Sequence, residues 1–505
     1  MEQIRSFGSS IKTSITRYGV PVYDPKGEDI ELCPKETTLN FVGNDVAQPN
    51  GHAPVSITNH AAAETPQTPT TPTPTPSRGT PQTGGTSTVW QAGWNVGNCM
   101  QGIGILSLPY TVKEGGVASL ITMIVVLLIG NYTSKILVYC LYEDDPTSKD
   151  EKGKPKKIRV RNSYSDVADL CLPRGGSLLN IMQIVDVTAV AALYLELSGA
   201  LLVDTFPFGF SKLAWTVISA LVLLPTIFFR NLTRISWLSF VAILSLVAMF
   251  MSVVWYSLGR SVRWEIDTVP PFKIQSFSVS ASIILFNFGT QFIMPGVEES
   301  MADRTQFNKV LNITYVITGV LNILYALFAF LTFAENTHEF ITYNMPLGPI
   351  QATVSSLFVI KSMLSYPLML FIVVNSVDAM ELPYLPPCYN PDGQINRLPP
   401  IWAMIFRGLL VAFTLFLAVC IPHFTLLMGV TGSLTSPWLD FIFPSLFYMK
   451  LKRHKLRLWE ISLNWVIVVI GFIEGLIGLI YSLMALILAY MDDFDPNYHF
   501  DIDNL

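Results

Sequence analysis

The feature that most constrains this chain is a series of long apolar segments, each able to cross a lipid bilayer. A helix spans the hydrocarbon core with about 20 apolar residues, because each residue advances it by about 1.5 Å. Charged residues make up 14% of the 505 residues, whereas soluble domains carry about 25%. We therefore predict an all-α polytopic membrane protein with about eleven transmembrane helices, at residues 90–111, 117–142, 178–206, 213–229, 235–259, 276–298, 310–334, 350–378, 401–421, 424–449 and 462–490.

Lysine and arginine are distributed unequally between the loops on the two sides of the predicted membrane. Loops after the even-numbered spans hold about eighteen of them, including eight in 149–176 and five in 450–457. Loops on the other side hold about five, and the acidic segment 491–505 holds none. Cytosolic loops carry the excess of positive charge. We therefore predict a cytosolic N-terminus and a C-terminus on the opposite, extracytosolic side.

Residues 1–88 are polar and include a proline- and threonine-rich tract at 64–85. Such a composition buries too little apolar surface to offset its ordering entropy. We predict a disordered cytosolic tail, which is either passive or a phosphorylation segment or a segment bound by trafficking proteins. The tail lacks an apolar signal-peptide core.

Cysteine and histidine show none of the patterns typical of an enzyme or a metal protein. The six cysteines form no CxxC pair, and the six histidines are dispersed among tails and loops. We predict no disulfide framework, no metal site and no enzymatic activity. The net charge of −5 gives no reason to expect nucleic acid as a partner.

Glycine and polar residues interrupt two predicted spans near their centres. Gly102 and Gly104 interrupt the first span, and Asn287 and Gly289 interrupt the sixth. Freed backbone groups are tolerated at membrane depth where they line a cavity or meet a ligand, and breaks in matching positions of two inverted repeats mark a substrate site. Alternatively, the glycines only allow close helix packing. The predicted organisation is a tail (1–88), two five-helix repeats (89–259 and 260–449), a basic loop with an extra helix (450–490) and an acidic tail (491–505).

These two breaks suit a zwitterionic ligand. N–H groups of the half-helix that begins near Gly104 carry partial positive charge and suit a carboxylate. Carbonyls of the second break, with Thr290 or Gln291, can accept hydrogen bonds from an ammonium. Phosphate is less suitable because neither break contains Lys or Arg. The candidate substrate-binding residues are Gln101, Gly102, Ile103, Gly104, Ile105, Phe288, Gly289, Thr290, Gln291, Ser365 and Tyr366.

Ionisable side chains at membrane depth are costly, so each needs a physical reason. Asp186 lies about 12 Å into the third span, where apolar surroundings favour a protonated carboxyl. It is our first proton-coupling candidate; the alternative is a hydrogen-bonded partner in the bundle. Glu196, about 15 Å nearer the lumen, is either a second proton site or a solvated helix end. Lys361 could pair with Asp186 or stand in for a sodium ion.

Four further ionisable residues lie near span ends or in the last span. Glu298 and Glu299 end the sixth span, where they form a gate or interface pair or are simply solvated. His423 lies in the short turn before the tenth span and could sense lumenal acidity, because imidazole changes charge near physiological pH. It could equally be uninvolved. Glu474 in the last span has no clear role, although an oligomer contact would explain it.

Several runs resemble the amino acid/auxin permease superfamily, and within it the vesicular inhibitory amino acid transporters. The runs are AGWNVGN, QGIGILSLPYTVKEGG, ALYLELSG, LLPTIFFRNL, VIKSMLSYPLMLF and IPHFTLLMGVTGSLTSPWLDFIFPSLFYMKL, and the resemblance covers about residues 90–490. It implies a leucine-transporter-like fold of two inverted five-helix repeats. It also implies that GABA or glycine enters synaptic vesicles in exchange for lumenal protons, with no cofactor and with chloride as a further coupling ion proposed for the family.

The resemblance bears differently on the two buried acids. Members of the family carry an acid at the position of Asp186, but the position of Glu196 is usually apolar in the vesicular group. Two alternatives stay open on the sequence: a proton-coupled neutral amino acid transporter of the lysosome or plasma membrane, and an amino acid sensor built on the same fold. Concentrative uptake that depends on a proton gradient would separate transport from sensing.

Overall fold

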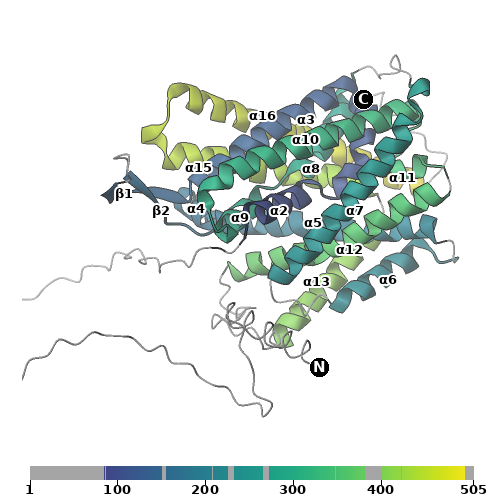
Figure 1. Cartoon of the computed structure of the whole chain (residues 1–505), viewed down its shortest axis with the longest axis horizontal. Coiled ribbons are helices and arrows are strands. Elements are labelled where there is room, and N and C mark those ends of the chain that lie inside the picture. Colours follow the sequence, from purple (N-terminus) through teal and green to yellow (C-terminus); the bar gives the residue numbers. More distant parts are fainter. Residues whose placement is uncertain are drawn as a thin grey trace, which may run out of the picture. The chain divides into compact units, whose positions relative to one another are not determined.

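The computed structural model describes residues 85, 87–149, 155–206, 209–225, 232–264, 272–346, 348–380, 401–421 and 423–494. The chain divides into two units, Met1–Pro76 and Ser77–Leu505. Most of the predicted tail 1–88 and residues 495–505 lie outside the described residues. The second unit is built from helices, with one small sheet at the end where β1 and β2 lie in Figure 1.

Most elements of the second unit are α-helices, with a few short turns and two strands between them. The helices are α2 (Val89–Met100), α3 (Leu108–Tyr139), α4 (Tyr164–Cys171), α5 (Gly175–Thr205), α6 (Lys212–Leu223), α7 (Leu232–Leu258), α8 (Ile274–Phe288), α9 (Met294–Ser300), α10 (Phe307–Phe333), α11 (Ile341–Asn344), α12 (Pro349–Asp378), α13 (Ile401–Cys420), α14 (Phe424–Leu434), α15 (Phe443–Leu451) and α16 (Leu458–Phe494). Three short segments matter for the site: the 3₁₀ turns η1 (Ile103–Ser107) and η5 (Gln291–Ile293), and the π-helix η8 (Pro437–Ile442). The strands are β1 (Tyr142–Lys149) and β2 (Pro155–Arg159).

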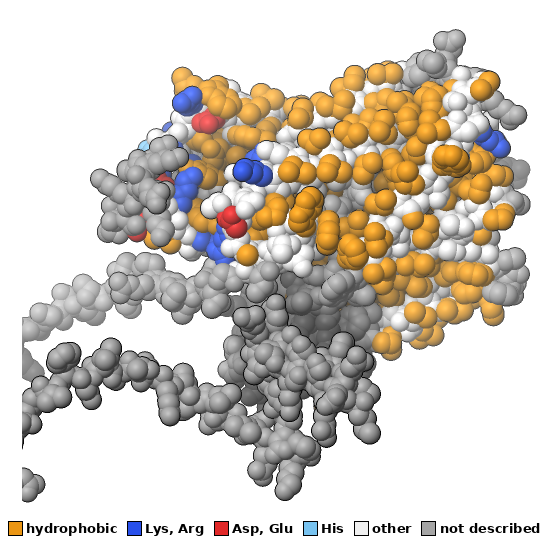
Figure 2. Space-filling view, in the orientation of Figure 1, with side chains coloured by type: hydrophobic (Ala, Val, Ile, Leu, Met, Phe, Trp, Pro, Cys, Tyr) orange, Lys and Arg blue, Asp and Glu red, His pale blue; other side chains and the backbone are white. Residues whose placement is uncertain are grey.

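Within the described residues, nine helical segments are long and apolar enough to cross a membrane. Hydrophobic side chains cover much of the face shown in Figure 2, as expected for a surface against lipid. The all-α polytopic class is therefore confirmed, but the predicted count of eleven is not. The first two predicted spans are one reason, because Ile103–Tyr139 counts as one membrane-spanning segment, although Gly116 (φ 59°, ψ −144°) breaks its helix between the two predicted spans. The other is α6, which is only 12 residues long.

The packing of the bundle brings the two interrupted segments together. α3 packs against α8 and α10, and α5 packs against α12. α14 packs against both α8 and α16. Through these contacts η1 reaches α8, and η5 reaches η8. The two interruptions therefore lie close together inside the bundle, with η1 against α8 and η5 against η8.

The antiparallel hairpin β1–β2 lies in the basic loop that follows α3 and contacts the basic segment that follows α15. Tyr142 pairs with Arg159 in the register of the hairpin. The Lys452 ammonium donates to the Tyr142 carbonyl at 2.5 Å, and Lys455 forms an ion pair with Asp144. Since the basic segments that follow α3 and α15 touch each other, they lie at the same end of the bundle.

Candidate functional site

The first interruption lies between α2 and α3. α2 ends at Met100, and Gly102 is extended, with φ −61° and ψ −155°. Gly104 lies against the second interrupted segment, since a Cβ atom there would be 2.8 Å from Asn287 Oδ1. Any side chain at this position would collide with the amide. Glycine is therefore required for the close approach of the two segments.

The second interruption lies between α8 and α9. α8 ends at Phe288, Gly289 is extended, and Pro295 lies in the first turn of α9. A Cβ atom on Gly289 would lie 2.5 Å from Asp440 Oδ2. The glycine thus makes room for a carboxylate from the π-helix η8. π-Helical turns occur mostly as short bulges, often at functional sites.

A cavity of about 30 Å³ lies between the two interruptions. Its size suits one or two water molecules. Both Asn287 side-chain atoms and Asp440 Oδ1 are buried there without a hydrogen-bond partner among the described residues. The cavity is lined by Cys99, Gly102, Ile103, Gly104, Asp186, Val190, Tyr194, Phe286, Asn287, Gly289, Phe292, Met369, Ser436 and Asp440.

Asp186 is buried in this cavity and bonded to a threonine of α14–η8. Thr435 Oγ1 lies 2.5 Å from Asp186 Oδ1 and 2.8 Å from the Thr431 carbonyl oxygen. A hydroxyl has one proton, and a carbonyl can only accept. Both contacts are satisfied together when the Asp186 carboxyl carries a proton and donates it to Thr435.

Lys361 lies beside Tyr194 rather than beside Asp186. Its ammonium is 3.3 Å from the Tyr194 hydroxyl and 5.1 Å from the centre of that ring. Among the described residues, no ion pair joins Lys361 to Asp186, so the partner expected from the sequence is not the one found. Ser365 lies one turn along α12, also buried. The Tyr366 hydroxyl is bonded to Thr414 Oγ1 at 2.7 Å.

Thr290 and Gln291 face the neighbouring helices α3 and α10. Gln291 Nε2 donates to Thr133 Oγ1 at 2.8 Å, and its Oε1 accepts from the Thr290 N–H at 2.9 Å. Thr290 Oγ1 lies 3.1 Å from the Tyr315 hydroxyl, which is 3.0 Å from Ser134 Oγ. These groups hold the second interruption in place and lie outside the lining of the small cavity.

The predicted substrate-binding residues therefore divide into two groups. Gly102, Ile103, Gly104 and Gly289 line the small cavity. Gln101 caps α2, Ile105 is buried in η1, and Phe288 ends α8 inside the core. These three lie outside the lining, as do Thr290, Gln291, Ser365 and Tyr366.

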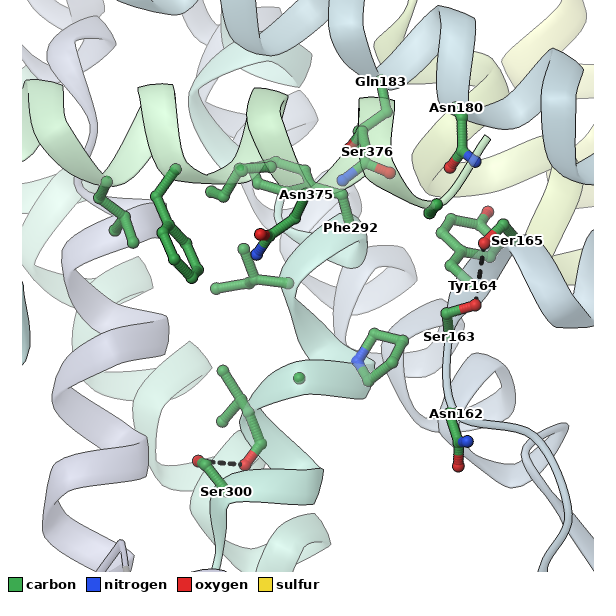
Figure 3. Close-up of a pocket in the computed structure, with 18 of the residues that line it drawn as sticks. Asn162, Ser163, Tyr164, Ser165, Asn180, Gln183, Phe292, Ser300, Asn375 and Ser376 are labelled. Carbon is green, nitrogen blue, oxygen red and sulfur yellow. Dashed lines mark hydrogen bonds between the residues drawn. The ribbon is translucent and has the colours of Figure 1, made fainter. Parts of the chain in front are cut away.

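A larger cavity, of about 290 Å³, adjoins the end of the bundle that carries the hairpin. Figure 3 shows Asn180 and Gln183 of α5, Asn375 and Ser376 of α12, and the stretch from Asn162 to Ser165 around it. Phe292 lines both this cavity and the small one. Phe292 therefore lies between the larger cavity and the space between the interruptions.

Glu298 and Glu299 lie in an ion-pair network at the hairpin end. Arg159 Nη1 is 3.6 Å from Glu298 Oε2, and Arg159 Nη2 is 3.5 Å from Glu299 Oε2. Arg304 adds a contact to Glu298 at 3.9 Å, and the Tyr142 hydroxyl donates to Glu298. Burial, reinforced by the bond to this carboxylate, raises the pKa of Tyr142 to about 12. Glu298 is thus a buried, paired charge, and the solvated alternative is wrong for it.

The remaining predicted residues lie away from the small cavity. Glu196 is buried and lies 2.8 Å from the Lys212 ammonium, so it is not a solvated helix end. His423 precedes α14, with its ring 5.0 Å from that of Tyr490. Glu474 faces α8 and is 3.1 Å from Ser282 Oγ, a contact within the bundle rather than at its surface.

Sequence reasoning missed Asp440 and the ring of Phe292. Asp440 is the single acid in the apolar run TSPWLDFIFPSLF, which was a signal that could have found it. Among the described residues, no group of three or more His, Cys, Asp or Glu could hold a metal ion.

Comparison with known proteins identifies relatives over most of the chain. Residues 85–488 match the family model described as transmembrane amino acid transporter protein. The vesicular inhibitory amino acid transporter of Homo sapiens is 37% identical over 80% of this chain and 77% of its own length. The vesicular GABA transporter of Caenorhabditis elegans is 30% identical over 79% and 80%. The crystal structure of MhsT in complex with L-phenylalanine shares the fold, with a TM-score of 0.53 over 79% of this chain and all of that one, at 10% identity.

Proposed function

The chain belongs to the transmembrane amino acid transporter family, and on this premise we propose that it loads GABA or glycine into synaptic vesicles in exchange for lumenal protons. The observation that carries the proposal is the small cavity between the two interrupted segments. Unpartnered buried polar groups cost about 1–3 kcal/mol each, so these groups suit a polar ligand, for which the cavity of about 30 Å³ has to widen. The names of the relatives support GABA and glycine as that ligand.

Asp186 is the proposed proton carrier. It lines the same cavity as the unpartnered groups of Asn287 and Asp440. Its contact with Thr435 is satisfied best when the carboxyl is protonated, whereas deprotonation would oblige Thr435 to release the Thr431 carbonyl. Proton loss would therefore change the hydrogen bonding of α14 next to the site. This couples the charge of Asp186 to the packing around the substrate.

Alternating access would operate through the two cavities. We propose that the hairpin end is cytosolic, because the basic residues of 155–161 and of 450–457 lie there. The 290 Å³ cavity is then the cytosolic entrance, and Phe292 closes it from the substrate. The division into inverted repeats, 89–259 and 260–449, and a lumenal C-terminus complete this proposal.

The test uses the purified full chain in proteoliposomes with an imposed acid-inside pH gradient. Uptake of radiolabelled GABA and of glycine is measured with and without a protonophore. The proposal requires accumulation of at least one of them that the protonophore abolishes. Uptake that persists without a pH gradient would overturn proton exchange, and chloride and sodium would then be varied as driving ions.

Two other outcomes would point to the alternatives. Binding without accumulation under any ion gradient would indicate an amino acid sensor on a transporter fold. Proton-driven accumulation of larger neutral amino acids, with GABA and glycine excluded, would indicate a lysosomal or plasma-membrane transporter. Immunogold labelling of the full chain in neurons would then separate vesicle from lysosome.

A further inference from the structure

Asp440 presents an unpartnered carboxylate oxygen to the small cavity. The residue is 5% exposed, and Oδ1 has no hydrogen-bond partner among the described residues. An isolated buried carboxylate is strongly unfavourable unless a cation or a proton meets it. The position therefore favours either a proton on the carboxyl itself or a cationic ligand that donates a hydrogen bond.

No lysine or arginine is among the residues that line this cavity. Lys361, a buried cation of α12, contacts the Tyr194 ring and hydroxyl instead. Asp186 adds a second carboxyl to the lining, and that carboxyl is already bonded to Thr435. The cavity thus has an excess of acceptors for a cationic group.

The protein holds Asp440 in this position. Its carboxylate accepts a bond from the backbone N–H of Gln291, at the start of η5. Gly289 leaves room for Oδ2, since a Cβ atom there would approach it to 2.5 Å. With one side of the carboxylate fixed against the second interruption, Oδ1 is left for a ligand.

Asn287 lies near the end of α8, beside the second interruption, and has two unused groups. It is 2% exposed, and neither its amide nitrogen nor its oxygen has a partner among the described residues. The nitrogen can donate to a carboxylate, and the oxygen can accept from an ammonium. Its contact with Gly104 puts the amide beside the half-helix η1–α3.

From these contacts we propose that Asp440 receives the ammonium group of the transported amino acid, with Asn287 bridging the ammonium and carboxylate ends. The inference rests on the proposed function and assigns a substrate class to its site: compounds with a protonated amine that still carries N–H donors. Asp186 keeps the separate task of carrying the proton.

This assignment predicts a sharp ranking of three probes of similar length. GABA has an ammonium with N–H donors, 4-(trimethylammonio)butanoate has the charge without donors, and butanoate has neither. In the full chain, we expect only GABA to inhibit uptake of the labelled substrate at low concentration. Equal inhibition by butanoate would overturn an ammonium receptor at this site.

Asp440→Asn removes the charge and keeps the shape. We expect the concentration for half-maximal counterflow to rise about 10-fold or more, because a charge-assisted hydrogen bond is lost. Counterflow exchanges labelled for unlabelled substrate with no net proton movement. It therefore separates an ammonium receptor from a second proton site: a variant with normal counterflow but no proton-driven accumulation would make Asp440 a proton carrier and overturn the proposal.

Two further variants test whether a loss of affinity in Asp440→Asn comes from misfolding. Asp303→Asn is the matched control, because Asp303 is exposed at the start of a surface turn and Asn caps equally well; its counterflow should be unchanged. Gly289→Ala leaves Asp440 intact but pushes on its carboxylate, and should also weaken apparent affinity while the protein stays monodisperse. Unchanged affinity in both site variants would contradict the proposal. Wild-type accumulation is measured in parallel, so failure of the proposed function itself is seen independently.

Discussion

At the scale of single residues, the contact between Asp186 and Thr435 makes a prediction about coupling. Asp186→Asn keeps a donor toward Thr435 Oγ1 and so mimics the protonated carboxyl. We expect proton-driven accumulation to fall about 10-fold or more, whereas counterflow and thermal stability stay near wild type. The measurements are uptake under an imposed pH gradient and counterflow in the same vesicles. Wild-type accumulation by this variant would remove Asp186 from the mechanism.

Gly104 gives a second residue-scale prediction. A methyl group there would lie 2.8 Å from Asn287 Oδ1, so Gly104→Ala should displace the amide and Gly104→Leu should fill the cavity. We expect about 10-fold weaker binding for alanine and no measurable binding for leucine. Gly408→Ala is the matched control, since a Cβ atom on Gly408 meets nothing within 4 Å. Unchanged affinity in Gly104→Leu would mean that the interruption is only structural.

At the scale of elements, the hairpin β1–β2 is tied to α9 by buried charge. Arg159 and Glu298 side chains are 4% and 1% exposed, and removing one partner of a buried pair leaves the other uncompensated, at a cost of about 3–5 kcal/mol. We expect Arg159→Gln to lower the thermal unfolding midpoint by several degrees and to change the transport rate. Lys455→Gln, which breaks the more exposed pair with Asp144, should change neither appreciably.

Tyr142, the tyrosine of this ion-pair network, should keep its proton throughout the physiological pH range. Burial raises the pKa of Tyr142 to about 12, from an ordinary 10.0. The stabilisation from its bound proton is therefore complete below pH 10 and is lost only as pH rises through 12. Tyr142→Phe should leave the pH dependence of transport between acidic lumen and neutral cytosol unchanged. An altered profile in that range would show that the hydroxyl titrates there.

Element boundaries set by local chemistry were predictable, and contacts set by tertiary packing were not. Both helix interruptions follow from glycine and proline within a few residues of each other, which act without regard to the rest of the fold. The roles of Thr290 and Gln291 depend on Thr133 and Tyr315, far away in sequence. Asp440 lines the cavity from the π-helix η8, and Gly289, far away in sequence, makes room for its carboxylate.

At the scale of the whole molecule, the start of α2 is joined to the end of α9, so the outer ends of the two interrupted segments meet. The Ser87 N–H donates to the Ser300 carbonyl at 2.8 Å, and the Ala302 N–H donates to the Ser87 carbonyl at 3.0 Å. Thr88 and Gln91 form a capping box that begins α2. Sequence composition placed residues 1–88 in one tail, but residues 87 and 88 belong to the bundle.

This junction predicts different effects for two truncations of nearly equal length. Removing residues 1–80 leaves the bridge and the cap intact, so initial uptake rates in proteoliposomes should stay within about twofold of wild type. Removing residues 1–88 deletes the bridge and a cap worth about 1 kcal/mol, which frees the end of α2 from α9. We expect a severalfold lower rate and a lower thermal midpoint for that variant, measured at equal protein per vesicle. A severalfold lower uptake rate already on removing residues 1–80 would show that the tail takes part in transport. An unchanged rate on removing residues 1–88 would show that transport does not need the junction between α2 and α9.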